Sequence, residues 1–315
     1  MLYFKQLDSI RAIAVSLVII CHWVPANYVF VDDDLGQIGA LGVNIFFVLS
    51  GFLITRILID YKSQIISSNL KKSAALKVFY FRRALRIFPI YYLYMLLLPV
   101  LFTIPSSELF HSLTYTINFY FFEAKYWSPY TTHLWSLAVE EQFYLFWPLF
   151  VLFINKRYLL HVIFSFIAIG LSTQLLVTDH EFGYLPTYTC LDAFGIGALI
   201  AWTFVYKFDL FSKTYSTLTS LALACILLTL LGFQYSDLRF ILPQRTVHSL
   251  IAAWLIITIT FSEKFPWLKA SFIVENKFLI FIGKISYGIY LYHLIIPDIT
   301  YQAHKRFDAF LPNFL

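Results

Sequence analysis

Two side chains that lipid solvates poorly, a guanidinium and an imidazole, lie in the first long apolar segment of the chain. Arg11 and His22 stand in RAIAVSLVIICH, with ten residues between them. Eleven steps of about 100° return an α-helix almost to its starting direction, so both groups face one side, about 16 Å apart along the axis. Ionisable groups inside a membrane are costly and mark functional sites. The pair therefore predicts a reactive imidazole at depth and a fixed positive charge nearer one membrane surface.

A second group of cations follows in FYFRRALRIFPIYY, residues 79–92. Arg83 and Arg86 are three residues apart and Arg82 and Arg86 are four apart, so all three can crowd one side of a helix end. Convergent guanidinium groups favour bidentate binding of phosphate or carboxylate. Arginines at a cytoplasmic boundary also serve as simple topological anchors. These residues alone leave both interpretations open.

Two further motifs place polar residues inside apolar sequence. Ser50 and Gly51, in GVNIFFVLSGFLITRIL, predict either close helix–helix packing or a local break that exposes polar backbone. Glu140 and Glu141, in THLWSLAVEEQFYLFWP, point about 100° apart, so at most one shares a helix face with Tyr144. A carboxylate that points inward can orient an imidazole or an arginine, whereas one at the membrane boundary is only solvated.

Two histidines outside the first helix have an ordinary interpretation. His133, at the start of the glutamate segment, is typical of an interface position. In IGKISYGIYLYHLIIP, residues 282–297, Tyr287, Tyr290 and His293 recur every three residues and could line one wall of a cavity. Core packing with a snorkelling lysine explains that segment equally simply.

The elements that carry these residues are predicted to be membrane-spanning helices. Of 315 residues, 60% are hydrophobic and 13% charged, and the mean hydropathy is +0.73. A soluble fold of this length cannot hide so much apolar surface. Runs long enough to cross a bilayer lie at 10–26, 39–59, 86–104, 138–154, 159–177, 189–206, 216–233, 245–262 and 279–297. With 108–122 as a tenth span or an interfacial segment, we predict an all-α polytopic integral membrane protein of about ten transmembrane helices.

Basic residues predict the orientation of these helices. The stretch from 60 to 86 is rich in lysine and arginine, whereas the first loop between spans holds Asp32, Asp33 and Asp34 and no base. The positive-inside rule then puts the N-terminus and the second loop in the cytoplasm. Arg11 is expected near the cytoplasmic face and His22 deeper or toward the outer face. The protein is expected in the cytoplasmic (inner) membrane.

Charge and cysteine content limit the classes of partner. The net charge of +5 gives no reason to expect nucleic acid. Cys21, Cys190 and Cys225 lie in or beside apolar runs with no CxxC spacing, so neither a disulfide framework nor a metal site is predicted.

Taken in order, these segments closely resemble the membrane-bound acyltransferase-3 family. The resemblance rests on FFVLSGFLI, RRALRIFPIYY and HLWSLAVEEQFY, preceded by the Arg11–His22 pair; it is strong over residues 7–150 and returns at GKISYGIYLYH. It implies one transmembrane domain over residues 1–315 and transfer of an acyl group, usually acetyl, onto an acceptor. Acceptors in the family are mostly sugar hydroxyls of lipopolysaccharide O-antigen, exopolysaccharide, peptidoglycan or nodulation factors, and macrolides are another class.

The family's motifs fall on residues already singled out: Arg11 and His22; Ser50, Gly51 and Phe52; Arg83 and Arg86; Glu140 and Glu141. Asn44 departs from the pattern, because many members carry an acidic residue there, and no carboxylate role is expected at that position. Many relatives also carry an extracytoplasmic hydrolase-like domain that is not expected here. The chain is therefore expected to complete the transfer alone or with a separate partner protein.

The chemistry of acyl transfer suits the first helix. A sugar hydroxyl that attacks a thioester needs a base to take its proton, and neutral imidazole titrates near the working pH. We expect His22 to be that base and Arg11 to hold the donor or the oxyanion, with Glu140 and Glu141 in supporting catalytic roles. The distance of about 16 Å from Arg11 to His22 is comparable to the reach of a pantetheine arm.

The donor is expected to be an acyl-CoA, most simply acetyl-CoA, with no metal. Arg82, Arg83 and Arg86 would hold its phosphates at the cytoplasmic face, and Ser50 and Gly51 would lie beside it. The other expected partners are the glycan or lipid-linked glycan acceptor and membrane lipid.

Two other mechanisms and one other function stay open. His22 or Cys21 could accept the acyl group first, although neighbouring residues on a helix point about 100° apart, which makes activation of Cys21 by His22 awkward. A transporter or flippase of a lipid-linked glycan would share the spans and the buried histidine. It would have no need for a coenzyme A site, so the arginine motif distinguishes the two functions.

Overall fold

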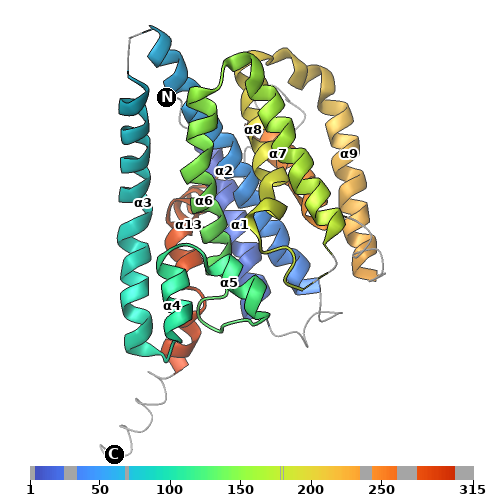
Figure 1. Cartoon of the computed structure of the whole chain (residues 1–315). Coiled ribbons are helices and arrows are strands. Elements are labelled where there is room, and N and C mark those ends of the chain that lie inside the picture. The colour runs from blue at the N-terminus through green and yellow to red at the C-terminus, as the bar shows by residue number, and fades with distance from the viewer. Residues whose placement is uncertain are drawn as a thin grey trace, which may run out of the picture.

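The computed structural model describes residues 4–24, 34–67, 71–177, 179, 181–234, 243–260 and 275–301. Within these ranges the regular elements are helices and no strand occurs, which confirms the predicted all-α class. The long helices run side by side as a bundle (Figure 1). They are α1 (Gln6–Trp23), α2 (Asp34–Ser67), α3 (Lys72–Leu101), α6 (Leu134–Phe153), α7 (Lys156–Leu176), α8 (Leu191–Tyr206), α9 (Asp209–Gln234), α11 (Gln244–Thr260) and α13 (Lys277–Tyr292).

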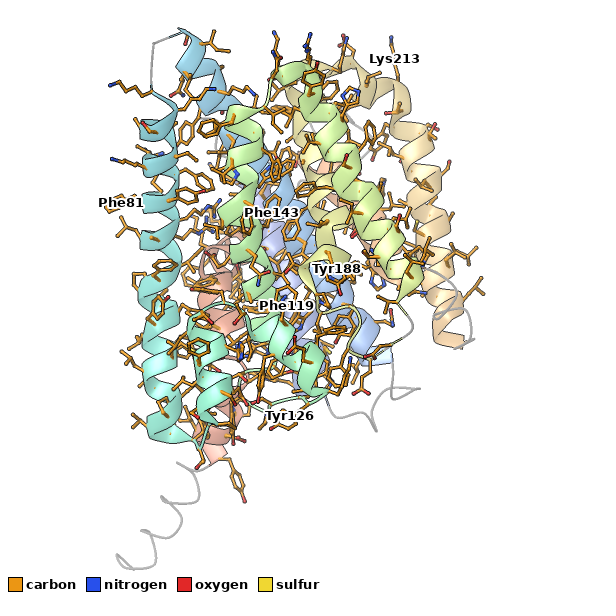
Figure 2. All side chains as sticks on the ribbon, viewed as in Figure 1. Phe81, Phe119, Tyr126, Phe143, Tyr188 and Lys213 are labelled. Atoms are coloured by element: carbon orange, nitrogen blue, oxygen red, sulfur yellow. The ribbon has the colours of Figure 1, made fainter. Side chains whose placement is uncertain are left out.

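Helix length and composition agree with a multi-pass membrane protein. Six described helices are long and apolar enough to cross a membrane, and a seventh span results if α13 is joined to the segment Ile295–Tyr301, from which it bends by 70°. Each of the nine clear runs in the sequence overlaps one of the long helices. Apolar side chains on the outside of the bundle are exposed, as Phe81 on α3 illustrates, whereas Phe143 packs between α6 and α8 (Figure 2).

The segment 108–122 does not form a tenth span. It folds into two eight-residue helices, α4 (Ser106–Leu113) and α5 (Ile117–Ala124), separated by a turn in which Tyr115 has a φ of 54°. Eight residues of helix rise only about 12 Å, too little to cross a hydrocarbon core. Both helices lie near the end of the bundle at which α3 ends (Figure 1).

Helix α2 lies at the centre of the bundle and packs against α1, α6, α8 and α11. It continues without a break through Ser50 and Gly51, so the sequence feature marks close packing and the predicted alternative of a local break is wrong. A Cβ atom on Gly51 would lie 2.2 Å from the carbonyl oxygen of Phe194, and one on Gly197 would lie 2.0 Å from that of Val48. Glycine at these two positions lets the backbones of α2 and α8 touch.

Helix α13 packs closely along α1. A Cβ atom on Gly283 would lie 1.7 Å from the carbonyl oxygen of Asp8, so the two backbones meet where α1 begins. At the other end of this contact, the indole N–H of Trp23 donates to the carbonyl of His293 at 2.8 Å. Helices α1 and α13 therefore lie together, and each has a histidine at its C-terminal end.

The two ends of the bundle differ in charge. Where α2 ends and α3 begins, and where α6 meets α7 and α8 meets α9, basic side chains gather: Lys62, Lys71, Lys72, Lys156, Arg157, Lys207 and Lys213. We call this the basic end. At the opposite end Lys125 pairs with Asp179, and Glu123 and Glu181 lie nearby in the chain. Figure 2 shows Lys213 and Tyr126 at these opposite ends. Asp32 and Asp33, used above to predict orientation, lie outside the described residues.

The contact between α2 and α8 gives a prediction for stability. Gly51→Ala places a methyl group against a backbone oxygen, and such overpacking costs about 1–3 kcal/mol. Gly288→Ala is the matched control, because nothing lies within 4 Å of its added Cβ and alanine favours a helix by about 1 kcal/mol. We expect the thermal unfolding midpoint of detergent-purified protein to fall for the first variant and to hold or rise for the second. Equal midpoints would contradict the contact.

Candidate active site

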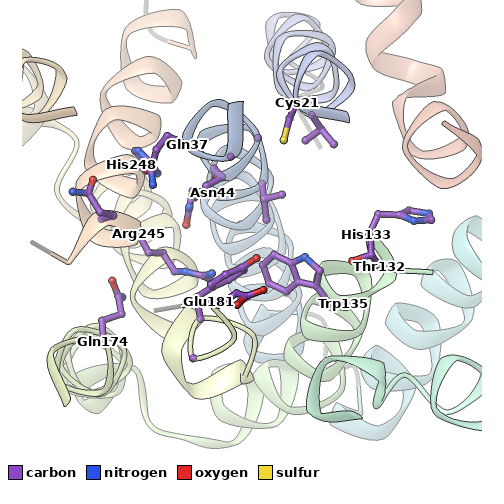
Figure 3. Close-up of a pocket in the computed structure, with 18 of the residues that line it drawn as sticks. Cys21, Gln37, Asn44, Thr132, His133, Trp135, Gln174, Glu181, Arg245 and His248 are labelled. Carbon is purple, nitrogen blue, oxygen red and sulfur yellow. Dashed lines mark hydrogen bonds between the residues drawn. The ribbon is translucent and has the colours of Figure 1, made fainter. Parts of the chain in front are cut away.

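A cavity of about 630 Å³ lies at the end of the bundle opposite the basic end. We call it the His22 cavity (Figure 3). Helix α1 contributes Cys21 and His22, helix α2 contributes Asn44, and Figure 3 shows further side chains from α11 and from the segments that precede α6 and α8. Polar and aromatic side chains thus surround one space that is large enough for a small organic ligand.

A second, smaller cavity of about 90 Å³ lies on the basic side of the first. We call it the arginine cavity, after Arg11, Arg83 and Arg86 in its wall. Arg11 lies only five residues after α1 begins, which is about 8 Å along the helix. Val43 and Tyr290 line both cavities, so the two spaces are separated by shared side chains.

Polar groups in the arginine cavity bind one another. The hydroxyl of Ser50 donates to Oε1 of Glu140 at 2.7 Å and lies 2.8 Å from the hydroxyl of Tyr144. The guanidinium carbon of Arg83 lies 4.8 Å from the centre of the Tyr144 ring. Glu140 and Tyr144 share a face of α6, as expected for residues four apart, and Glu141 also lines the cavity. Ser50 therefore links α2 to the face of α6 that carries the carboxylates.

The arginine cavity contains guanidinium groups that are free to contact a ligand. Arg11 forms an ion pair with Asp8, one turn earlier in α1. Among the described residues, Arg83 and Arg86 make no ion pair within 4.0 Å, although two carboxylates share their cavity. Guanidinium groups in such a position can bind phosphate or carboxylate through paired N–H groups.

The hydrogen-bond partners of His22 decide which nitrogen is basic. Its Nδ1 lies 2.9 Å from the carbonyl oxygen of Val18 and 3.1 Å from Nε2 of His293. A carbonyl oxygen only accepts, so Nδ1 of His22 carries the hydrogen. Nδ1 of His293 lies 2.6 Å from the carbonyl of Tyr290 and carries its hydrogen for the same reason, which leaves its Nε2 as an acceptor. The free lone pair of His22 is therefore on Nε2.

A third imidazole completes this cluster. His133 lies immediately before α6 and is buried, not placed at an interface as its position in the sequence indicated. Its ring centre is 5.1 Å from that of His293, and its Nε2 lies 2.9 Å from the carbonyl oxygen of Leu291. Burial, together with the neighbouring imidazoles of His293 and His22, holds the pKa of His133 well below its usual range. This ring is therefore neutral at physiological pH.

The predicted site residues fall into three groups. The structure brings together Arg11, Ser50, Arg83, Arg86, Glu140 and Glu141 around the arginine cavity. It places His22 in the other cavity, three helical turns away from Arg11. Arg82 and Gly51 line neither cavity: Arg82 is exposed and donates to the hydroxyl of Tyr61 at 3.3 Å, and Gly51 packs against α8. The three arginines also lie within a continuous helix, α3, and not at a helix end.

Sequence reasoning gave no role to several residues of the His22 cavity. Arg245 and His248 lie three residues apart near the start of α11, and both line this space. The sequence did contain a sign of this site, because Arg245 and His248 place a guanidinium and an imidazole in an apolar run, as Arg11 and His22 do. The sequence could not show that His293 is the partner of His22, because this contact depends on the packing of α13 against α1.

The comparisons with known proteins bear on this arrangement. Residues 4–310 match the model of the acyltransferase-3 family, which is described as an acyltransferase domain. The chain belongs to this acyltransferase family. Peptidoglycan O-acetyltransferase OatA of Listeria monocytogenes is 30% identical over 332 residues, which cover 95% of this chain and 50% of that protein. O-acetyltransferase OatA of Staphylococcus aureus is 28% identical over 325 residues, 92% of this chain and 50% of that one.

These comparisons confirm the family resemblance that the motifs indicated. The chain spans about half the length of the curated relatives it matches. No solved structure matches it.

Exposure of the histidines gives a chemical test of the cavity. Diethylpyrocarbonate modifies neutral imidazole nitrogens that it can reach. His22 is exposed, whereas His293 and His248 are 1% and 0% exposed. We expect mass spectrometry of briefly treated protein to find His22 modified well before the other two. Modification of His248 as fast as His22 would contradict the described cavity.

Proposed function

We propose that the chain is a membrane O-acyltransferase that moves an acyl group, most simply acetyl, from acyl-CoA to a hydroxyl of a cell-surface glycan or glycolipid. The supporting observation is the pair of cavities that share Val43 and Tyr290. One cavity offers cationic side chains on the basic side of the bundle, and the other offers the free Nε2 of His22. Donor and acceptor could thus reach one reaction centre from opposite ends.

The proposed orientation follows from the charges at the two ends. The basic end carries lysines and arginines at several helix connections, so the positive-inside rule assigns it to the cytoplasm of the producing cell. Helix α1 begins at this end, since Gly42 of α2 packs against Ala14 and Gly39 packs against Cys21 in antiparallel order. The N-terminus would then be cytoplasmic and the His22 cavity would face outward, with the protein in the cytoplasmic membrane.

The donor would bind along the arginine cavity. Its volume of about 90 Å³ suits the narrow acyl-thioester end of a pantetheine arm and is too small for a nucleotide. The nucleotide and its phosphates would therefore stay toward the basic end, where Arg82 is exposed. Arg83 and Arg86 would hold the part of the donor that enters the bundle, and Arg11 would lie closest to His22 along α1.

His22 would act as the general base. Its Nε2 takes the proton of the acceptor hydroxyl while that oxygen attacks the thioester carbonyl carbon. The carbon–sulfur bond then breaks, and the thiolate takes the proton back from Nε2. His293 supports this role, because its Nε2 accepts the Nδ1 hydrogen of His22 and stabilises the imidazolium. A positioned base contributes about 10²–10⁴-fold to such a rate.

Cys21 lines the same cavity and represents the covalent alternative. Direct transfer is the simpler proposal, since the tautomer of His22 already presents a base to the cavity. Activity retained in Cys21→Ser would close the covalent route through the thiol.

The acceptor is proposed from the relatives' names. One relative is named for peptidoglycan, so peptidoglycan is the first polymer to test, followed by other surface glycans such as lipopolysaccharide. We also include a separate extracytoplasmic partner protein in the proposal. Mass spectrometry should show that surface glycans from cells with the chain are heavier, by one acyl unit, than those from cells without it.

Loss of the base should abolish transfer. We expect His22→Ala to lower acetylation of the cell-surface glycan by about 10²–10⁴-fold with no change in the amount of membrane protein. His161→Ala on α7 is the matched control, because His161 is exposed and lines neither cavity. Unchanged acetylation in His22→Ala would remove the proposed base.

Donor binding can be tested without the acceptor. We expect acetyl-CoA to raise the unfolding temperature of detergent-purified protein, because a ligand that binds only the native state stabilises it. Arg83→Gln should weaken this protection, whereas Arg157→Gln, an exposed arginine on α7, should retain it. A transporter of lipid-linked glycans would gain no stability from acetyl-CoA, so the absence of protection in the unmodified protein would favour that alternative.

A further inference from the structure

Arg245 is a buried cation in the wall of the His22 cavity. It lies in the first turn of α11 and is 8% exposed. Its guanidinium carbon lies 5.5, 5.6 and 5.8 Å from the ring centres of Trp135, Tyr184 and Phe47. Aromatic rings attract a cation but do not neutralise it. The side chain is therefore held in place by rings, with its charge available to a ligand.

The hydrogen bonds of Arg245 leave donors unused. One terminal nitrogen donates to the sulfur of Cys190, a weak acceptor, and Nε is buried without a partner. Among the described residues, no carboxylate lies within ion-pair distance, 4.0 Å, of Arg245. A buried guanidinium without a carboxylate partner costs free energy, which an anionic ligand would recover.

Three acidic side chains lie near this part of the protein, and none forms an ion pair with Arg245. Asp179 pairs with Lys125, and Glu181 is exposed and accepts from the indole N–H of Trp127 at 3.2 Å. Oδ2 of Asp192 accepts from the hydroxyl of Thr246 at 2.6 Å, Oδ1 of Asp192 has no hydrogen-bond partner in the described part of the chain, and Asp192 does not line the cavity.

His248 adds a second unused polar group to the same wall. It follows Arg245 by three residues, so both lie on one face of α11. The ring is 0% exposed, and both of its nitrogens are buried without a partner among the described residues. Figure 3 shows Arg245 and His248 on α11 at the side of the cavity where Gln37 and Asn44 also lie.

Aromatic rings cover another part of the wall. Trp135 and Tyr184 meet edge to face with ring centres 5.4 Å apart. The rings of Trp127 and Tyr184 are stacked, with their centres 6.2 Å apart. The C–H face of a sugar ring packs on such surfaces, while its substituents need convergent polar groups. The cavity thus combines an aromatic surface, of the kind on which sugar rings pack, with one buried cation.

We propose that the His22 cavity binds an acidic saccharide, with the anionic substituent of the sugar paired with Arg245, beside which His248 lies. This inference rests on the proposed function, because it names the class of acceptor that His22 would deprotonate. The anionic group of the sugar is either a carboxylate or a phosphate, both of which present negatively charged oxygens to Arg245. A free hydroxyl of the same sugar lies toward His22. Arg245 is a specificity residue in this scheme and takes no part in bond making.

The test is saccharide binding by the full chain in detergent. The probes are glucuronic acid, glucose 6-phosphate and neutral glucose, and the readouts are the unfolding temperature and the Kd. We expect at least one acidic probe to bind and glucose to bind about ten-fold more weakly or not at all. A response to glucuronic acid alone identifies a carboxylate, and a response to glucose 6-phosphate alone identifies a phosphate.

Substitution of Arg245 distinguishes binding of the acidic saccharide from binding of the donor. Arg245→Gln should weaken binding of the acidic probe about ten-fold or more and leave protection by acetyl-CoA unchanged. Lys125→Gln is the control, a cation near the same cavity that does not line it. If Arg245→Gln does not fold, Arg245→Lys replaces it, since lysine keeps the charge and loses the paired donors.

Two outcomes would overturn the inference. One is equal stabilisation by glucose and by both acidic probes, and the other is undiminished binding of the acidic probe in Arg245→Gln. Failure of acetyl-CoA to protect the unmodified protein would instead count against the proposed function, and the two failures are read from separate titrations.

Discussion

The Nδ1 hydrogen of His22 is held between two acceptors, the carbonyl oxygen of Val18 in its own helix and the imidazole of His293 at the end of α13. Every chemical role of His22 depends on this arrangement, because it fixes the tautomer and leaves Nε2 free. The second acceptor is present only because α13 packs directly on α1, where Gly283 leaves room for the backbone of Asp8. A larger residue at Gly283 would separate the helices and release the ring.

The same physical requirement shapes the rest of the bundle. Polar groups that leave water must find partners inside the protein. In the arginine cavity Ser50 binds Glu140 and Tyr144, and at the basic end Lys62 donates to the carbonyl oxygen of Val151 at 2.7 Å. Among the buried polar atoms of the described residues that lack a partner, Nε of Arg245 and both nitrogens of His248 belong to residues in the wall of the larger cavity. Because these unpartnered groups lie beside a cavity, a polar ligand in that cavity is the simplest partner for them.

Much of the fold and part of the site could be predicted from the sequence. Apolar runs located the long helices, since span length is set by the thickness of the bilayer. The segment 108–122 was ambiguous, because a short apolar run does not say whether it continues as one helix or turns, as it does at Tyr115. Spacing along one helix correctly grouped Arg83 with Arg86, but it also included Arg82, which the structure turns toward Tyr61.

The sequence by itself determined the helical class, the family and the presence of costly charges in apolar segments, because composition and spacing within one helix are local properties. Tertiary structure decided which of those charges meet. His22 and His293 are 271 positions apart, and Ser50 and Glu140 are 90 apart, so no helical periodicity relates them. Only the packing of α13 on α1, and of α6 on α2, brings these groups within hydrogen-bond distance.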